Sequence, residues 1–333
     1  MRNTLRAALV TVVACGGMAL AISGAHAQSP PKESAARVEL YPIPTLTLSD
    51  RQFLTGSSEG APATVSGEFR IAQGTGRLPV VVLVHGSSGV GPAMEPWVHT
   101  FNAMGISTFV IDGFTGRGLT VVGPNQALLG RLNLIVDIYR SLDILAKHPR
   151  VDADRIVLMG FSRGGQAALF ASLDRFNKLW NKSGVRFAGY IPFYPDCSTS
   201  YVGDTEIADK PIRIFHGAPD DYNPVASCKA YVARLLDAKR DVVLTEYPDS
   251  EHAFDNGLLG VSSKVVSANA QTVRNCHIRE GNDGVLMNAE TQAPFSYKDA
   301  CVELNPHVGG NPQTAEAARK AVSEFLAALF KLG

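Results

Sequence analysis

The amino-acid sequence predicts an α/β fold in which helices flank a mostly parallel, doubly wound sheet. Most of the expected strands are continuous apolar runs, which is typical of strands buried on both faces of a parallel sheet. Helical patterns lie between most of these runs and would supply the crossover connections. Short loops rich in Gly, Ser, Asp and His follow several of the runs. In such sheets, ligand-binding groups gather at the carboxyl ends of the strands.

Apolar runs and turn signals place the elements in order along the chain. The strands are expected at 63–71, 80–85, 107–111, 155–160, 187–193, 212–216 and 242–247. The helices are expected at 95–104, 125–147, 164–179, 224–238 and 314–332. No internal repeat or low-complexity linker divides the chain, which favours a single domain over 28–333. Residues 255–313 break the alternation, and we interpret them as an insertion or lid beside the site.

The first 27 residues have the pattern of a secretory signal peptide. Arg2 and Arg6 precede an apolar stretch over 7–22, and Ala25-His26-Ala27 forms a small-x-small end. Cleavage before Gln28 would make the mature protein periplasmic or secreted. Two alternatives stay open, namely lipidation at Cys15 and an N-terminal membrane anchor that is never cut.

Composition gives little sign of a macromolecular partner. Removing Arg2 and Arg6 from 31 basic residues leaves 29 against 31 acidic ones, a formal charge of −2 on the mature chain. This balance does not favour binding to nucleic acid or to a membrane surface. No apolar stretch beyond the leader is long enough to span a bilayer. A small-molecule substrate is therefore the expected partner, and the oligomeric state stays open.

Four cysteines would remain after cleavage, an even number in a chain expected in an oxidising compartment. Three pairings are possible. We favour Cys197 with Cys228 and Cys276 with Cys301, because each bond then closes a local loop. A metal site at Cys276-His277 is the alternative, but it lacks the C-x-x-C spacing by which two thiolates hold one ion. No metal is expected.

A glycine-rich turn follows the apolar run 155–159 and precedes the helical pattern 166–170. Its sequence is Gly160-Phe161-Ser162-Arg163-Gly164-Gly165. A G-x-S-x-G turn between strand and helix is typical of a nucleophile elbow, in which glycines allow the sharp reversal and leave the serine hydroxyl exposed. The alternative is a plain Gly-rich turn. We expect Ser162 to be a catalytic nucleophile.

A serine nucleophile needs a general base and an acid that orients the base. Asp220 and Asp221 both follow the strand expected at 212–216. We favour Asp220, because Asp221 suits a turn or a cap of the helix that begins near Pro224. Asp221 remains the alternative acid.

The base candidate is His252, which directly follows the strand expected at 242–247. Its alternative is an exposed loop histidine. Surface positions are expected for His277 and His307, a helix end for His148, and a core position for His216.

An oxyanion hole combines the backbone N–H after the nucleophile with another from the loop after an earlier strand. Arg163 supplies the first. Ser87, in the loop His85-Gly86-Ser87-Ser88-Gly89, is our choice for the second. An ordinary Gly/Ser turn is the alternative for this loop.

These motifs resemble the dienelactone hydrolase family of the α/β-hydrolases. The resemblance lies in His85-Gly86, in Asp112-Gly113-Phe114 with Arg117-Gly118, in the Ser162 turn, in the 217–224 segment with Asp220, and in His252-Ala253-Phe254. It covers roughly residues 60–255 and the final helix. It implies the α/β-hydrolase fold and a hydrolase of carboxylic esters or lactones with no metal or organic cofactor. The serine would act through an acyl-enzyme intermediate.

Several features depart from the family. Dienelactone hydrolase itself has a cysteine nucleophile where this chain has Ser162, and neither export nor a cysteine-bearing insertion belongs to the cytoplasmic enzyme. Arg117 and Arg163 are candidates to hold a substrate carboxylate as arginines do in that enzyme, although we favour a structural ion pair for Arg117. A peptidase of the prolyl-oligopeptidase type and a non-catalytic binding protein on a hydrolase scaffold are the alternative functions.

Overall fold

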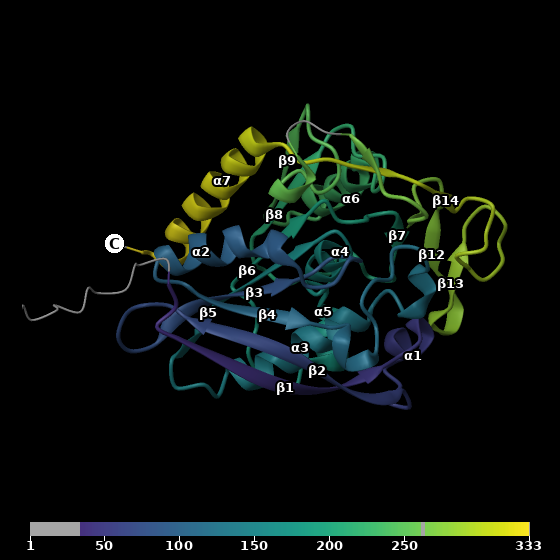
Figure 1. Cartoon of the computed structure of the whole chain (residues 1–333). Coiled ribbons are helices and arrows are strands. Elements are labelled where there is room, and N and C mark those ends of the chain that lie inside the picture. Colours follow the sequence, from purple (N-terminus) through teal and green to yellow (C-terminus); the bar gives the residue numbers. More distant parts are fainter. Residues whose placement is uncertain (1–33, 261–263, 333) are drawn as a thin grey trace, which may run out of the picture. The chain divides into compact units, whose positions relative to one another are not determined.

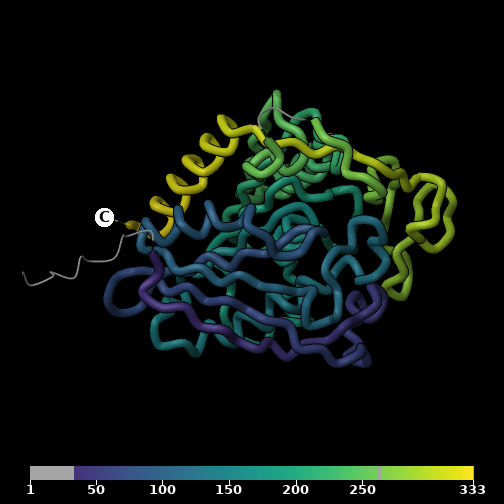
Figure 2. Tube along the Cα trace, in the orientation of Figure 1, coloured from purple at the N-terminus to yellow at the C-terminus, as the bar shows by residue number. Residues whose placement is uncertain are grey.

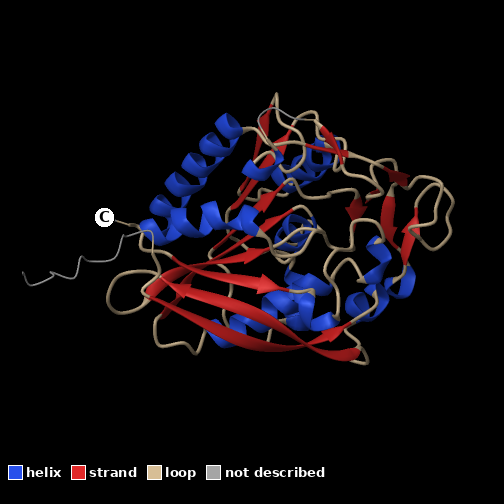
Figure 3. Cartoon of the chain, in the orientation of Figure 1, coloured by secondary structure: helices blue, strands red, loops and turns tan. Residues whose placement is uncertain are grey.

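The computed structural model describes residues 34–260 and 264–332. The predicted leader lies outside the described residues. The largest element is a twisted eight-stranded sheet with the order β1-β2-β4-β3-β5-β6-β8-β9, seen in Figures 1 and 3. From β4 to β9 all neighbouring strands are parallel. At the other edge, β1 and β2 run antiparallel to their neighbours. The predicted mostly parallel sheet is confirmed.

The strands of this sheet match the predicted runs closely, with one addition. They are β1 (Arg37–Thr47), β2 (Ala61–Ile71), β3 (Leu78–Val84), β4 (Ser107–Asp112), β5 (Val151–Phe161), β6 (Gly189–Phe193), β8 (Ile212–Gly217) and β9 (Val242–Tyr247).

Helices cover both faces of the sheet. They are α1 (Asp50–Thr55), α2 (Glu95–Ala103), α3 (Asn133–Leu145), α4 (Arg163–Phe170), α5 (Asp174–Trp180), α6 (Val225–Asp237) and α7 (Pro312–Phe330). Short 3₁₀ turns are η1 (Pro92–Met94), η2 (Thr115–Arg117), η3 (Gln126–Leu128), η4 (Gly257–Leu259) and η5 (Asn282–Gly284). Within the described ranges, no helix combines the length and the apolar character needed to cross a bilayer.

The continuous apolar runs have a direct structural cause. In β3, Val80 and Val82 pack into one core with α3 and α4, whereas Val81 and Leu83 pack into a second core with α2 and α7. All four side chains are fully buried. Successive residues of a strand point to opposite faces, so a strand covered on both sides has no polar positions.

Two predicted helices are shorter in the structure. The helix expected at 125–147 begins only at Asn133, because the preceding loop makes tertiary hydrogen bonds: the carbonyl of Gly130 accepts from the Arg163 guanidinium. The helix expected at 164–179 divides into α4 and α5. Between them, the backbone carbonyl of Ser172 accepts from the N–H of Ala208, and the extended Leu173 forms a β-bridge.

One strand, β1, was not predicted from the sequence; it contains Pro42 and Pro44. Proline lacks a backbone donor, so it is tolerated only where one side of the strand needs no partner. As an edge strand paired only with β2, β1 meets this condition.

The segment from 264 to 311 leaves the sheet after β9 and returns to α7, as the yellow-green chain in Figure 2 shows. It contains short paired strands: β10 (Val265–Val266) with β15 (His307–Val308), and β11 (Gln271–Thr272) with β14 (Glu303–Leu304). β12 (Ile278–Glu280) pairs with β13 (Leu286–Asn288) and with β7 (Thr199–Ser200).

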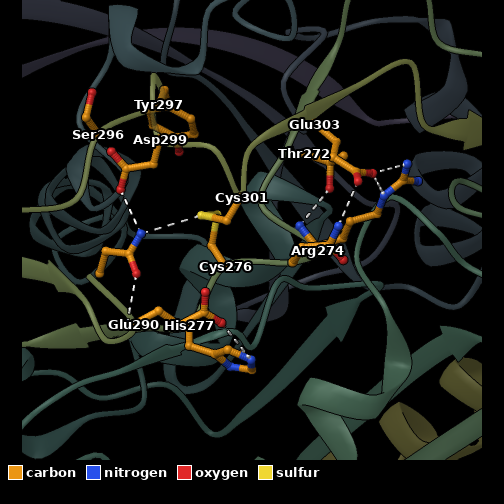
Figure 4. Close-up of a disulfide and its surroundings, with 12 residues drawn as sticks. Thr272, Arg274, Cys276, His277, Glu290, Ser296, Tyr297, Asp299, Cys301 and Glu303 are labelled. Carbon is orange, nitrogen blue, oxygen red and sulfur yellow. Dashed lines mark hydrogen bonds and ion pairs between the residues drawn. A yellow bond between two sulfur atoms is a disulfide. The ribbon is translucent and has the colours of Figure 1, made fainter. Parts of the chain in front are cut away.

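Both predicted disulfides are present, Cys197–Cys228 and Cys276–Cys301. The second disulfide joins the two segments just beyond the Thr272 and Glu303 pair of the β11–β14 ribbon; these residues are labelled in Figure 4. Because its sulfur is bonded to Cys301, Cys276 has no thiolate to offer a metal ion. The alternative reading of Cys276-His277 as a metal site is therefore wrong.

Candidate active site

Ser162 stands at the tight turn between β5 and α4. Its backbone has φ 54° and ψ −114°, a region that non-glycine residues adopt only under constraint. A Cβ on Gly160 would lie 2.1 Å from the carbonyl oxygen of Gly164, and one on Gly164 would lie 2.3 Å from that of Val84. The glycines at these positions are therefore required by close backbone approach, and the turn presents the Ser162 side chain beyond the end of the strand.

The structure brings the three predicted side chains together in a hydrogen-bonded chain. Nε2 of His252 lies 2.9 Å from Oγ of Ser162, and Nδ1 of His252 lies 2.8 Å from Oδ2 of Asp220. Both His252 and Asp220 are buried. A carboxylate only accepts hydrogen bonds, so Nδ1 carries the proton and Nε2 is left to accept from the serine hydroxyl.

The loop after β8 fixes the Asp220 carboxylate. Oδ1 of Asp220 accepts from the backbone N–H groups of Tyr222 and Asn223 at 2.9 and 2.8 Å. This arrangement leaves Oδ2 for His252.

Asp221 points the other way. Its carboxylate accepts from the backbone N–H of His307 at 2.8 Å and lies 2.7 Å from Nδ1 of the same residue. Of the two roles expected for Asp221, a turn or a cap, the cap is not observed, because α6 is capped at Pro224 without any side-chain hydrogen bond; Asp221 lies in the bend before that helix. Burial acts to raise the pKa of Asp221, but the hydrogen bonds and charge of His307 outweigh it and lower that pKa.

Two further histidines lie at the site with neutral rings. The Nδ1–H of His85 donates to the Gly86 carbonyl at 2.7 Å, and its Nε2 accepts from the Gly113 N–H at 3.1 Å. His216, which is 3.8 Å from Asp220, is completely buried, as predicted for a core histidine. Burial lowers the pKa of both His85 and His216.

The loop after β3 packs directly on the serine. A Cβ on Gly86 would lie 3.3 Å from the Cβ of Ser162. Among the described residues, the backbone N–H groups of Ser87 and Arg163 have no acceptor. An oxyanion hole requires two such unpaired donors.

Sequence reasoning missed Gln126, which connects this loop to its surroundings. Oε1 of Gln126 accepts from Nη1 of Arg163 at 2.7 Å and from Oγ of Ser87 at 3.2 Å. Its backbone N–H donates to the side chain of Gln271 in the insertion at 2.8 Å. No local motif marks Gln126, because its partners come from distant segments.

Two tyrosines beside His252 were also missed. The ring of Tyr194 meets the His252 ring edge-on at 4.7 Å, and Tyr222 stacks on it at 4.6 Å. Tyr194 directly follows β6, and its position at the carboxyl end of a parallel strand is the signal that could have identified it.

Asp255 is a buried carboxylate that holds Tyr194 in place. Its oxygens accept from the Tyr194 hydroxyl at 2.6 Å and from the indole N–H of Trp97 at 2.7 Å. Burial raises the pKa of Asp255. Tyr194 and Ala253 both have positive φ, 36° and 61°, a backbone region that non-glycine residues adopt only under constraint.

The arginine candidates have structural partners. Arg117 forms a two-pronged pair with the buried carboxylate of Asp137 at 2.7 and 2.8 Å, which confirms the favoured ion pair. The Arg163 guanidinium donates to Gln126, to the Gly130 carbonyl and, by a short contact, to the carbonyl of Leu129. Burial lowers the pKa of Arg163.

A cavity of about 670 Å³ opens beside Ser162 and His252. Its walls come from the loop after β3, from the chain between η2 and η3, from the loop that carries His252, and from the insertion. A smaller polar cavity of about 40 Å³ also touches Ser162, on the side of Arg131 and Arg163. The insertion thus forms part of the wall of the larger cavity.

The insertion is fastened to the loop that carries Asp220. Arg274 lies 3.3 Å from the Asp221 carboxylate and pairs with Glu303, and the Thr272 hydroxyl donates to the Tyr222 carbonyl at 2.6 Å. Figure 4 shows Thr272, Arg274 and Glu303 together beside the Cys276–Cys301 disulfide.

Comparison with known proteins gives one family and several similar folds. The profile of the dienelactone hydrolase family matches residues 70–275. A dienelactone hydrolase-like promiscuous phosphotriesterase, P91 from metagenomic libraries, is 15% identical with a TM-score of 0.53, covering 89% of this chain and 98% of that chain. A structure named m3DLH is 17% identical with a TM-score of 0.54 and the same coverages.

The carboxylesterase Cest-2923 from Lactobacillus plantarum is 15% identical with a TM-score of 0.49, covering 67% of this chain and 87% of that chain. No curated protein is significantly similar in sequence.

Proposed function

Because the chain belongs to the dienelactone hydrolase family, we propose that it is a serine hydrolase that cleaves a carboxylic ester or lactone through an acyl-enzyme intermediate. The observation that carries the proposal is the hydrogen-bonded chain from Ser162 through His252 to Asp220, at 2.9 and 2.8 Å. Both distances fall within the reach that proton transfer requires.

This geometry supports the following proposed reaction. Oγ of Ser162 attacks the ester carbonyl carbon while Nε2 of His252 takes the hydroxyl proton. The tetrahedral intermediate collapses, the bond to the alcohol oxygen breaks, and His252 returns the proton to that oxygen. Water then attacks the acyl-enzyme with His252 as its base, which releases the acid and restores Ser162. Asp220 keeps the proton on Nδ1 and stabilises the imidazolium.

The negative charge of the intermediate would be held by the backbone N–H groups of Ser87 and Arg163. Each such donor lowers the barrier by about 3 kcal/mol. Arg163 begins α4, so the positive end of that helix also faces the developing charge.

The test is hydrolysis of p-nitrophenyl acetate and butyrate by wild type, Ser162→Ala and a matched control, Ser57→Ala, whose half-buried serine lies in the loop after α1 and accepts from the Glu59 N–H. We expect Ser162→Ala to lower kcat/KM by at least a thousandfold without changing stability, and Ser57→Ala to behave as wild type. A fluorophosphonate probe should label the wild type but not Ser162→Ala. Folded wild type that neither turns over nor reacts with the probe would instead indicate a binding protein.

We further propose that the protein acts outside the cytoplasm. The signal-peptide pattern of residues 1–27 and the two disulfides support this location. Fractionation of the expressing cell followed by N-terminal sequencing tests it. Mature protein beginning at Gln28 in the exported fraction is expected, and full-length protein in the cytoplasm would contradict the proposal.

A further inference from the structure

The lining of the larger cavity beside Ser162 is mostly apolar. Its walls carry Val90, Met94, Val121, Leu258, Ala270 and Val308. Among the described residues that line it, there is no lysine or arginine, and the acidic side chain, Asp255, already accepts from Tyr194 and Trp97. The cavity therefore offers burial to an uncharged apolar group and no charge with which to hold an ionic one.

The apolar lining continues outward onto the exposed rim. Leu258 is 69% exposed, and Val90 and Val121 are each 46% exposed. Val265 is 45% exposed and is the strand partner of the cavity residue Val308. Single exposed apolar residues are normal, but a group that adjoins a cavity is typical of a ligand-binding surface. An apolar chain that fills the cavity could extend over this rim without meeting a charged side chain of the lining.

The other side of Ser162 has little space. The polar cavity of about 40 Å³ shares Ser87, Ser162 and Tyr222 with the larger one and has room for only a few water molecules. Its arginines are held through their terminal guanidinium nitrogens, since Arg131 donates to Thr199 and pairs with Asp196, and Arg163 donates to Gln126. The buried Nε of each arginine has no hydrogen-bond partner among the described residues. An ester carbonyl placed at Ser162 thus has one roomy apolar side and one confined side.

Resting on the proposed function, we propose that the substrate is an uncharged ester with one long apolar substituent, bound in the 670 Å³ cavity, and a small substituent on the other side of the carbonyl. The cavity lies within the range of about 300–1,000 Å³ that is usual for sites of organic ligands, and an acetyl or methyl group would occupy only a small part of it. A large lactone fits the same description only if its whole ring lies in the 670 Å³ cavity.

Two homologous series of esters test the proposal: one lengthens the acyl chain and the other lengthens the alcohol chain. One consists of methyl alkanoates from acetate to decanoate and the other of alkyl acetates from methyl to decyl, each kept below its solubility limit and followed by proton release. We expect kcat/KM to rise about two- to fourfold per methylene in one series, since each buried methylene contributes about 0.8 kcal/mol. In the other series kcat/KM should stay flat or fall, because the confined side cannot hold the chain.

Variants of the exposed apolar rim test whether the preference for a long chain depends on the cavity. We expect Leu258→Ser and Val121→Ser to lower the ratio of long-chain to short-chain kcat/KM about two- to fivefold. The matched control is Leu40→Ser on β1, which is 74% exposed and lies outside the cavity. That variant should leave the ratio at the wild-type value.

The outcomes separate this inference from the proposed function. Hydrolysis that depends on Ser162 but does not increase with chain length in either series, or increases equally in both, overturns the inference and leaves the serine hydrolase intact. An equal effect of Leu258→Ser and Leu40→Ser on the ratio also overturns it. Absence of Ser162-dependent hydrolysis for every ester overturns the proposed function itself.

Discussion

The ring of Tyr222 stacks on the imidazole of His252, with centroids 4.6 Å apart and planes inclined by 27°. The backbone N–H of the same tyrosine donates to Asp220 at 2.9 Å. One residue therefore contacts both the candidate base and the carboxylate that would orient it: the main chain of Tyr222 donates to Asp220, and its ring packs on His252. Burial raises the pKa of Tyr222 to about 12, so its hydroxyl is neutral at working pH.

We expect Tyr222→Ala to reduce kcat/KM about two- to tenfold, because a stacked aromatic pair contributes about 0.5–1.5 kcal/mol. Tyr222→Phe keeps the ring and should retain most of the activity. Steady-state kinetics on a p-nitrophenyl ester from pH 6 to 9 checks this. Equal losses in the two variants would mean that the hydroxyl, not the stacked ring, is responsible.

We expect Asp255→Asn to destabilise the protein by about 1–3 kcal/mol, because the amide oxygen can accept from the Trp97 N–H while the NH₂ group can only donate to the Tyr194 oxygen, which leaves the buried Tyr194 O–H without its acceptor. Because Tyr194 packs on His252, kcat should fall more than KM changes. Urea unfolding and steady-state kinetics measure the two effects. The control is Asp249→Asn at an exposed position. Matching stabilities for the two variants would contradict the role of the buried network.

Buried His216 should make stability depend on pH. Its Nδ1–H donates to the Gly217 carbonyl at 3.1 Å, and burial lowers its pKa although Asp220 at 3.8 Å opposes this. The unfolded chain, with a histidine pKa of about 6.5, then binds a proton that the folded chain resists. Stability is therefore fully present above about pH 6.5 and is lost as the pH falls below it.

The slope attributable to His216 reaches at most about 1.4 kcal/mol per pH unit. Unfolding in urea between pH 5.5 and 8 for wild type and His216→Gln provides the comparison. The variant should be less stable overall but should show a shallower loss towards low pH. Two parallel curves would show that His216 does not contribute.

Removing the Cys276–Cys301 disulfide by Cys276→Ser with Cys301→Ser should lower the unfolding free energy by about 2–4 kcal/mol. The bond joins residues separated by 25 positions and restricts the unfolded chain by closing that loop. Thermal unfolding of the double variant, with reduced wild type beside it, measures the change. An unchanged midpoint in both would indicate that the ribbon is held by its ion pairs alone.

The local chemistry of the chain was readable from the sequence because it depends on neighbouring residues. Continuous apolar runs predicted buried parallel strands, and β3, β4, β5, β6, β8 and β9 lie where those runs are. The glycines around Ser162 predicted a tight turn, and the backbone there leaves no room for a Cβ. Parallel strands end at one edge of a sheet, so Ser162, Asp220 and His252 could be expected near each other.

Contacts between distant segments could not be predicted from neighbouring residues. The choice between Asp220 and Asp221 depends on His307, which lies 86 positions further along and binds only Asp221. The break between α4 and α5 depends on backbone hydrogen bonds to residues 206–208. Gln126, Tyr194 and Asp255 carry no motif, since each acts through partners on other elements.

Hydrophobic periodicity and turn chemistry are local properties, so the α/β class, the strand–turn–helix that carries Ser162, and the order of the candidate nucleophile, acid and base could be predicted from the amino-acid sequence. The folded chain was needed to learn which aspartate meets His252, how the insertion joins the wall of the cavity, and which side of Ser162 is roomy. Those features arise from packing between elements far apart in the chain, where register and side-chain volume, rather than neighbouring residues, select the partners.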